Sequence, residues 1–364
     1  MWNIVYLYIF LFSLLASTIF TFCSKKLAIR YGFLDQPNQV KFHTNAKPLL
    51  GGGVAIFFAC YLTILLNFII VYLAKDTSFL PASLKIHVPG IFRQGEKLSA
   101  ILLGGVLMML LGLYDDKKCI SPYGKLLSQI LIASVLFFLD VRITLFINNL
   151  WINYLITCGW VIFIINSFNL LDNIDGLSAG ICFISALLFF AVASALKQYF
   201  ISVMLLSLAG SLLGFLFYNF NPASIFMGDC GSLFIGYMMS VLTIQATYLP
   251  KGGSSFIPLI TPVLILAIPL YDTFSVIIIR IKTRTSIFKG DKNHFSHRLV
   301  RLGMSARGAV LFLYLVSFAI GISATILPYL NLASSLVLLI QAVAIILIVA
   351  LLEYFGKSRN AKKS

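Results

Sequence analysis

Long apolar runs separated by short polar segments make up most of this chain. Eleven of these runs are about 17–28 residues long, which is the length that a helix needs to cross the hydrocarbon core of a bilayer. The pattern therefore predicts an all-α polytopic membrane protein with about eleven transmembrane helices. The expected spans are residues 3–23, 50–74, 98–114, 126–141, 151–171, 177–196, 199–218, 232–249, 256–281, 309–327 and 333–354.

The polar segments between these runs show no internal repeat, no low-complexity stretch and no separate soluble part. We therefore interpret residues 1–364 as a single integral membrane domain. Its polar motifs fall within residues 35–303, its last two helices lie within 309–354, and a basic cytosolic tail covers 355–364.

Lysine and arginine are unevenly divided between the two sides of the membrane. The first apolar run is followed by Lys25 and Lys26 and has no basic residue before it. This favours a first transmembrane helix with its N-terminus outside over a cleaved signal peptide. The inner segments then hold 20 of the 27 basic residues, as the positive-inside rule requires. They are residues 24–49, 115–125, 172–176, 219–231, 280–308 and 355–364, so the C-terminus is cytosolic, and the outer loop 75–97, which is also basic, is the exception.

Composition agrees with a membrane protein and narrows the function. The chain is 60% hydrophobic and only 11% charged, which is too apolar for a soluble domain of this size. Its net charge of +15 follows from the positive-inside loops, so we expect no nucleic acid partner. The cysteines show no CxxC spacing, and no set of histidines and cysteines has zinc spacing, which argues against a zinc site.

Aspartates are concentrated on the inner segments. Seven of the twelve acidic residues lie there, and solvation of loops alone would not keep the outer loops nearly free of them. We therefore expect the functional site to face the cytosol. The seven are Asp35, Asp115, Asp116, Asp172, Asp175, Asp229 and Asp291.

The stretch from residue 166 to residue 180 is a polar interruption between two apolar runs. Its polar side chains recur every three residues, at Asn166, Asn169, Asp172 and Asp175. They line one side if the preceding helix continues through them. Because a carboxylate in the middle of a bilayer costs roughly 2.5–3.5 kcal/mol on insertion scales, we interpret this stretch as a site at an aqueous mouth.

Adjacent carboxylates end the third predicted span. Asp115 and Asp116 stand at the C-terminal end of a helix, where the helix dipole disfavours anions, so helix stability does not explain them. The pair can bind Mg²⁺, or one carboxylate can act as a base while the other orients. Lys125 can offset their charge or hold phosphate.

The segment before the span 232–249 carries a further carboxylate. Asp229 lies between glycines just ahead of a helix, so its side chain can project freely. Together with Asn169 it offers the oxygen ligands that Mg²⁺ prefers. Phe226 in the same segment either stacks on a base or packs against neighbouring side chains.

Basic and histidine side chains occur on the first and last large inner segments. A glycine-opened helix start with basic side chains nearby favours phosphate, and imidazole and guanidinium donors suit phosphate or sugar oxygens. The residues are Lys41 and His43 ahead of glycines 51–53, and His294, His297 and Arg298.

The ninth span, residues 256–281, contains prolines at 258, 262 and 269, which predict a kink. Asp272 follows and lies within about three helical turns of Arg280, which favours a partnered structural carboxylate over a catalytic one. A membrane transporter would use this kinked span and Asp272 as an ion path. It would, however, spread its acids across the depth of the bilayer, whereas the acids here cluster at the inner ends of helices.

Taken together and in this order, the motifs resemble those of the polyprenyl-phosphate N-acetylhexosamine-1-phosphate transferases, glycosyltransferase family 4. The matching pieces are DxPxxxKxH from Asp35 with GG at 51–52, GLYDD, NxxNxxDxIDG, FMGDxGS, and HxxH followed by Arg-Leu. Each motif alone is weak, but five in order are specific. The IPLYD run at 268–272 resembles the WecA/TagO-like branch more than MraY.

The resemblance implies a glycosyl-1-phosphate transferase with its active site on the cytosolic face of the bacterial inner (plasma) membrane. Such an enzyme transfers a sugar 1-phosphate, here GlcNAc-1-phosphate or a related HexNAc-1-phosphate, from a UDP-N-acetylhexosamine to undecaprenyl phosphate and releases UMP. This reaction initiates cell-envelope polysaccharide synthesis. The resemblance also implies Mg²⁺ as cofactor, with Mn²⁺ as an alternative, and a homodimer as one possible assembly.

The resemblance implies roles for individual residues by motif match. Asp115, with Asp116 beside it, deprotonates or orients the lipid phosphate. Magnesium ligands are Asn169 and Asp229. The nucleotide pocket consists of Asn169, Asp172, Asp175, Asn219 and Phe226, and phosphate or sugar contacts come from Lys41, His43, Lys125, His294, His297 and Arg298.

Three positions depart from the family pattern. Val40 stands where arginine is common, Asn173 replaces the first glycine of DGxDG, and Ser296 replaces the middle histidine of the last motif. The missing triple histidine argues against MraY. Phospho-MurNAc-pentapeptide transfer in peptidoglycan synthesis is kept as the alternative, and the identity of the sugar is left open.

Overall fold

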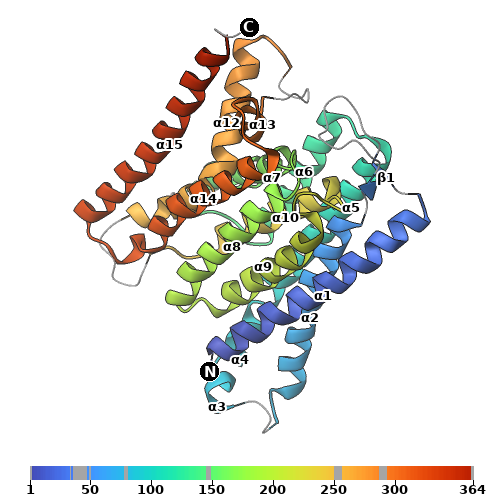
Figure 1. Ribbon diagram of the computed structural model, residues 1–364. Helices are drawn as coiled ribbons and strands as arrows, with labels where there is room; N and C mark the ends of the chain where they lie inside the picture. Colours follow the sequence, from blue (N-terminus) through green and yellow to red (C-terminus); the bar gives the residue numbers. More distant parts are fainter. Residues whose placement is uncertain are drawn as a thin grey trace.

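The computed structural model describes residues 2–32, 34–35, 47–48, 51–77, 81–144, 149–249, 256–286 and 293–361. Figure 1 shows these residues as a bundle of long helices joined by short connections. The α-helices are α1 (Trp2–Arg30), α2 (Gly52–Ala74), α3 (Ala82–Lys85), α4 (Val88–Arg93), α5 (Gly95–Lys118), α6 (Pro122–Phe138), α7 (Leu150–Leu171), α8 (Leu177–Ala195), α9 (Tyr199–Asn219), α10 (Gly228–Gln245), α11 (Thr261–Ile265), α12 (Ala267–Lys282), α13 (Phe295–Arg301), α14 (Ala306–Thr325) and α15 (Leu332–Ala361).

Shorter elements complete the described part of the chain. Two 3₁₀ turns cover Ile257–Ile260 and Leu327–Tyr329. The strands β1 (Leu34–Asp35) and β2 (Lys47–Pro48) form one antiparallel pair, in which residue 34 lies opposite 48 and residue 35 opposite 47.

The prediction of an all-α polytopic membrane protein is confirmed. In the described part of the chain, eight helices are long and apolar enough to cross a membrane, and the bent pair α11–α12 would make nine. The predicted spans 126–141 and 232–249 coincide with α6 and α10, which have only 17 and 18 residues. Because 17 residues of helix reach only about 26 Å, the count of eleven spans stays a prediction.

Helix α10 forms the centre of the bundle. Every residue from Cys230 to Thr243 is buried, and α10 packs against α2, α5, α7, α8 and α9. A helix that is apolar on all sides belongs inside a larger structure. The hydroxyl of Tyr237, itself fully buried, donates a hydrogen bond to the carbonyl of Ile101 in α5 (2.9 Å). The first turn of α10, which carries Asp229, is therefore held by a well-packed helix.

Helices α1 and α9 run side by side and are joined by small polar residues. The hydroxyl of Ser13 donates to the carbonyl of Ser207, and that of Ser17 donates to the carbonyl of Ser211, each at 2.5 Å. All four serines are buried. Small residues of this kind let the backbones of membrane helices approach closely.

The ninth predicted span is broken, as the prolines predicted. Helices α11 and α12 meet at an angle of 72°, and the break lies at Leu266. Pro269 explains the position, because a proline ring clashes with the carbonyl four residues earlier and provides no N–H for it. That carbonyl belongs to Ile265, the last residue of α11.

Candidate active site

The tight turn between α5 and α6 fixes the first part of the site. Only residues 119–121 separate the two helices. Ser121 accepts a hydrogen bond from the backbone N–H of Gly124 (3.2 Å) and Pro122 takes the first helical position, a combination favoured at helix starts. Because the chain reverses so quickly, Asp115 in the last turn of α5 faces Lys125 in the first turn of α6.

The ammonium group of Lys125 lies at the centre of the site. Its Nζ is 2.8 Å from Asp115 Oδ2 and 3.3 Å from Asp229 Oδ1. It also donates a hydrogen bond to Asn169 Oδ1 at 3.3 Å. The ends of α5, α6, α7 and α10 therefore converge on the ammonium group of Lys125.

The amide of Asn169 connects α7 to α10. Its Nδ2 donates to Asp229 Oδ1 and to the hydroxyl of Ser232, the latter at 2.8 Å. Its Oδ1 faces Lys125. Asn169 and Asp229 thus present oxygen atoms toward the same point, from two helices that are packed together.

Asp116 makes different contacts from its neighbour Asp115. Its two oxygens accept hydrogen bonds from the backbone N–H groups of Asp229 (2.8 Å) and Cys230 (3.0 Å), which are among the unpaired donors of the first turn of α10. Gly228 allows this approach, because it has φ of +69° and a Cβ there would lie 2.7 Å from Asp116 Oδ2. Asp116 therefore holds the helix start that carries Asp229.

Asp172 lies in the connection between α7 and α8, close to other carboxylates. Burial raises its pKa to about 8, and the nearby charges of Asp229, Asp116 and Asp175 raise it in the same direction. A like-charge cluster of this kind favours either a shared proton or a bound cation. The electrostatics thus agree with a site that takes up positive charge.

Asp175 and Asn219 join the two loops on the α8–α9 side of the site. Asp175 Oδ2 accepts from the backbone N–H of Ala223 at 2.9 Å. Asn219, only 3% exposed, accepts from the N–H of Gly176 and donates to the carbonyl of Ile225, both at 3.0 Å. Both side chains thus hold the segment before Phe226, and their predicted contact with the nucleotide stays a prediction.

The oxygen atoms at this point fit a hard divalent cation. No cluster of three or more His, Cys, Asp and Glu side chains suited to a metal exists among the described residues. Mg²⁺ does not need one, because it keeps water and substrate phosphates and takes one or two carboxylates from the protein. Asp229 and the amide oxygen of Asn169 match that requirement, and the lysine ammonium beside them marks the place where positive charge is favourable.

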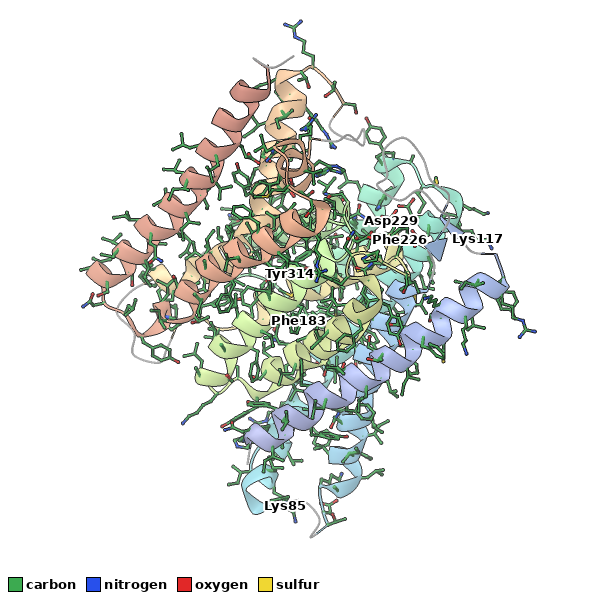
Figure 2. All side chains as sticks on the ribbon, in the orientation of Figure 1. Lys85, Lys117, Phe183, Phe226, Asp229 and Tyr314 are labelled. Atoms are coloured by element: carbon green, nitrogen blue, oxygen red, sulfur yellow. The ribbon has the colours of Figure 1, made fainter. Side chains whose placement is uncertain are left out.

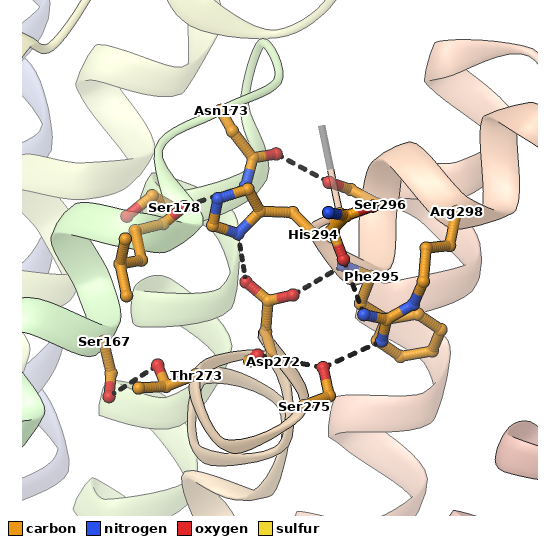
Figure 3. A network of polar contacts seen from close by, with 12 residues as sticks. Ser167, Asn173, Ser178, Asp272, Thr273, Ser275, His294, Phe295, Ser296 and Arg298 are labelled. Carbon is orange, nitrogen blue, oxygen red and sulfur yellow. Dashed lines mark hydrogen bonds and ion pairs between the residues drawn. The ribbon is translucent and has the colours of Figure 1, made fainter. Parts of the chain in front are cut away.

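A second polar network surrounds the short helix α13 (Figure 3). Asp272 of α12, 1% exposed, lies 2.9 Å from Nδ1 of His294 and accepts the backbone N–H of Phe295. Asp272 is therefore partnered by His294 and by the N–H of Phe295, and its structural rather than catalytic role stays a prediction. A carboxylate on one ring nitrogen fixes the orientation of an imidazole.

The remaining predicted site residues lie in the second network, beside Asp229 in the sequence, or outside the described part of the chain. Arg298 donates to Glu353, Ser275 and the carbonyl of Asn293, and its contact with phosphate or sugar stays a prediction. His297 is buried beside His294, with 6.1 Å between ring centroids. Phe226 precedes Asp229 by three residues, and both are labelled in the same region of Figure 2. Lys41, His43 and Asp291 lie outside the described residues.

Three residues that contact the candidate site or the second network were not assigned to it from the sequence. Ser232 touches Asn169 and could have been found, because it ends the FMGDxGS motif. Ser296 donates to Oδ1 of Asn173 at 2.6 Å, so two departures from the family pattern contact each other. Glu353, the partner of Arg298, is the only acidic residue of the last span, which was the available signal.

Comparison with known proteins gives consistent matches. Residues 98–247 match the model of Glycosyl transferase family 4. The chain is 34% identical over 326 residues to a probable undecaprenyl-phosphate N-acetylglucosaminyl 1-phosphate transferase of Bacillus subtilis, and the match covers 87% of this chain and 84% of the relative.

More distant relatives carry related names. A decaprenyl-phosphate N-acetylglucosaminephosphotransferase of Mycolicibacterium smegmatis is 31% identical, over 79% of this chain and 74% of the relative. An undecaprenyl-phosphate alpha-N-acetylglucosaminyl 1-phosphate transferase of Yersinia pestis is 27% identical, over 85% of this chain and 80% of the relative.

Proposed function

Because the chain belongs to glycosyl transferase family 4, we propose that it transfers N-acetylglucosamine 1-phosphate from UDP-N-acetylglucosamine to undecaprenyl phosphate and releases UMP. One observation carries the proposal. Four helix ends bring Asp115, Asn169 and Asp229 within contact distance of Lys125, which is an arrangement of charges suited to a diphosphate with a cation.

The chemistry is a displacement at phosphorus. An oxygen of the lipid phosphate attacks the β-phosphorus of the donor, a new P–O bond forms, and the bond from the β-phosphorus to the bridging oxygen breaks. UMP leaves with that oxygen. Because the acceptor is already an anion at neutral pH, a strong base is not needed, and Asp115 with Lys125 positions the lipid phosphate and offsets its charge.

The cation of this site is Mg²⁺ in our proposal, with Mn²⁺ as the alternative. Asp229 and Asn169 would hold it, and when bound it neutralises negative charge on the diphosphate and on the departing UMP. Asp116 keeps the start of α10 in place, so that Asp229 faces the same point as Asn169.

The remaining predicted residues complete the donor site in this proposal. Asp172 faces the nucleotide, and Phe226 provides an aromatic surface for the base. Asp175 and Asn219 support the loop that carries Phe226. Lys41, His43, His294 and His297 contact phosphate or sugar. The protein acts at the cytosolic face of the bacterial plasma membrane, and a homodimer stays a prediction.

The two alternatives have less support. The relatives named above are N-acetylglucosamine-phosphate transferases, which argues against transfer of phospho-MurNAc-pentapeptide. A transporter predicts acids at several depths. Instead, the acids lie close together at one end of the helices. Besides burial, the charges of Asp229 and Asp115 raise the pKa of Asp116. Those of Asp229 and Asp116 likewise raise the pKa of Asp172.

The direct test uses the purified full-length chain with labelled UDP-N-acetylglucosamine, undecaprenyl phosphate and Mg²⁺. We expect labelled lipid and stoichiometric UMP. Asp229→Asn should lower Mg²⁺-dependent turnover by at least about a hundredfold. Asp140→Asn is the matched control, since Asp140 pairs with Lys97 and Arg142 at the far end of α6. No labelled lipid with any UDP-HexNAc would reject the function, and an active Asp229→Asn would remove Asp229 from the metal site.

A further inference from the structure

Helix α15 lies at the edge of the bundle (Figure 1) and is mostly exposed. Only 17% of its apolar window is buried within the protein. Glu353 is nevertheless shielded, because its side chain is 14% exposed and pairs with Arg298, which is 13% exposed. A charged pair shielded to this extent costs desolvation energy, so its presence in an otherwise lipid-facing helix calls for an explanation.

Glu353 holds two groups from other elements. Its Oε1 accepts from Nε of Arg298 at 2.9 Å, and its Oε2 accepts from the hydroxyl of Tyr271 in α12 at 3.1 Å. The remaining guanidinium nitrogens of Arg298 donate to the carbonyl of Asn293 (2.6 Å) and the hydroxyl of Ser275 (2.9 Å). Arg298 therefore joins α15, α13 and α12 in one network, of which Figure 3 shows the contact with Ser275 of α12.

We call His294 together with α13 the histidine arm, because it carries His294 and His297. The arm is anchored at two points one helical turn apart, since Asp272 holds His294 and Glu353 holds Arg298. Between these points Ser296 donates to Asn173 at 2.6 Å. Asn173 directly follows Asp172, so the arm is hydrogen-bonded to the connection between α7 and α8, which belongs to the candidate site.

We propose that Glu353 is a positioning residue for the transfer reaction. Through Arg298 it fixes the histidine arm against the loop at Asp172, so that His294 and His297 face the donor. The last helix, which lies outside the residues that match the family model, is thereby part of the active-site architecture. The kinetic side of this inference rests on the proposed function.

The kinetic test compares Glu353→Gln with the wild type. Glutamine keeps the size of the side chain but removes the charge that Arg298 needs. We expect KM for UDP-N-acetylglucosamine to rise about tenfold while kcat changes less than about threefold, because donor binding is lost rather than the chemical step. Glu96→Gln is the matched control: Glu96 is the other glutamate of the chain and is exposed at the start of α5.

A coupling test separates positioning from general stability. Ser296→Ala removes the contact of the arm with Asn173. If Glu353 acts through the arm, the double variant Glu353→Gln/Ser296→Ala should raise KM by clearly less than the product of the two single effects. If the KM increase of the double variant equals the product of the two single increases, or if KM is unchanged in Glu353→Gln, the proposal is overturned.

Hydrogen exchange gives a readout that does not depend on activity. In Glu353→Gln we expect faster amide exchange in residues 293–301 and unchanged exchange in α10. Unchanged exchange in the arm would overturn the proposal. If the wild type transfers no sugar phosphate, the proposed function fails, and the exchange data alone then decide whether Glu353 anchors the arm.

Discussion

At the scale of single residues, Asp115 and Asp116 are neighbours in the sequence but make different contacts. Asp115 contacts Lys125 and the backbone N–H of Ile120, whereas Asp116 accepts from two N–H groups at the start of α10. The sequence placed both in one catalytic pair, because two consecutive aspartates at a helix end look equivalent. The difference depends on α10, whose first turn lies more than a hundred residues later.

Asn219 allows a test between support and direct nucleotide contact. In Asn219→Ala, the N–H of Gly176 and the carbonyl of Ile225 lose their partners in a buried place. The free energy of unfolding should fall by about 1–3 kcal/mol for each stranded group. Thermal unfolding of the purified protein in detergent measures this change as a lower midpoint.

Asn219→Asp is the comparison variant, since it keeps the acceptor for Gly176 but sets a carboxylate oxygen against the carbonyl of Ile225. Because an unpaired charge in a buried place is costly, we expect its thermal midpoint to lie below that of the wild type as well. A wild-type midpoint for Asn219→Ala together with a raised KM for the donor would contradict the supporting role and favour contact with the nucleotide.

At the scale of elements, the glycines at the start of α2 bring this helix against α10. The sequence interpreted this glycine run, with the basic side chains before it, as a helix start that favours phosphate. In the structure, the N–H of Gly53 donates to the carbonyl of Met227 (3.1 Å), and a Cβ on Gly53 would lie 2.2 Å from the backbone nitrogen of Gly231. Real Cβ atoms do not approach a backbone so closely.

Gly53→Ala should therefore displace the first turn of α10 and, with it, Asp229. Because a shift of about 1 Å at a reacting group can cost about a hundredfold in rate, we expect a loss of turnover of that order. Gly159→Ala is the control, since a Cβ at this helical glycine meets no atom within 4 Å. Turnover of both variants is measured in the same lipid-transfer assay. Equal turnover of Gly53→Ala and Gly159→Ala would show that α2 can shift without displacing Asp229.

At the scale of the whole molecule, local patterns predicted the helices and long-range contacts decided the site. Apolar run lengths predicted long membrane helices, and the three prolines of the ninth span predicted its kink, whose position before Pro269 came only from the structure. Lys125 and Asn169, although 44 residues apart, were both assigned to the site through motifs. The pair of Arg298 with Glu353, 55 residues apart, was not predicted, because no local pattern relates a helix end to a distant arginine.

The orientation of the bundle in the membrane is the last prediction. In Figure 2, Lys117 and Asp229 lie at one end of the molecule and Lys85 lies at the other. The distribution of basic residues predicts that the first end is cytosolic, even though Lys85 belongs to the basic outer loop 75–97. Cys119, which is exposed one residue after α5, is a native reporter for the site end.

The measurement uses the variant Lys85→Cys in a Cys23→Ser background, because Cys23 is also exposed. A membrane-impermeant maleimide added to intact cells should label position 85 and leave Cys119 unlabelled, and permeabilised cells should show both. Cys119 directly follows α5, and position 85 lies in the connection between α2 and α5, so neither reporter is within a long apolar helix. Labelling of Cys119 in intact cells without labelling at position 85 would reverse the orientation and place the site outside the cytosol, where a UDP-sugar donor is not expected.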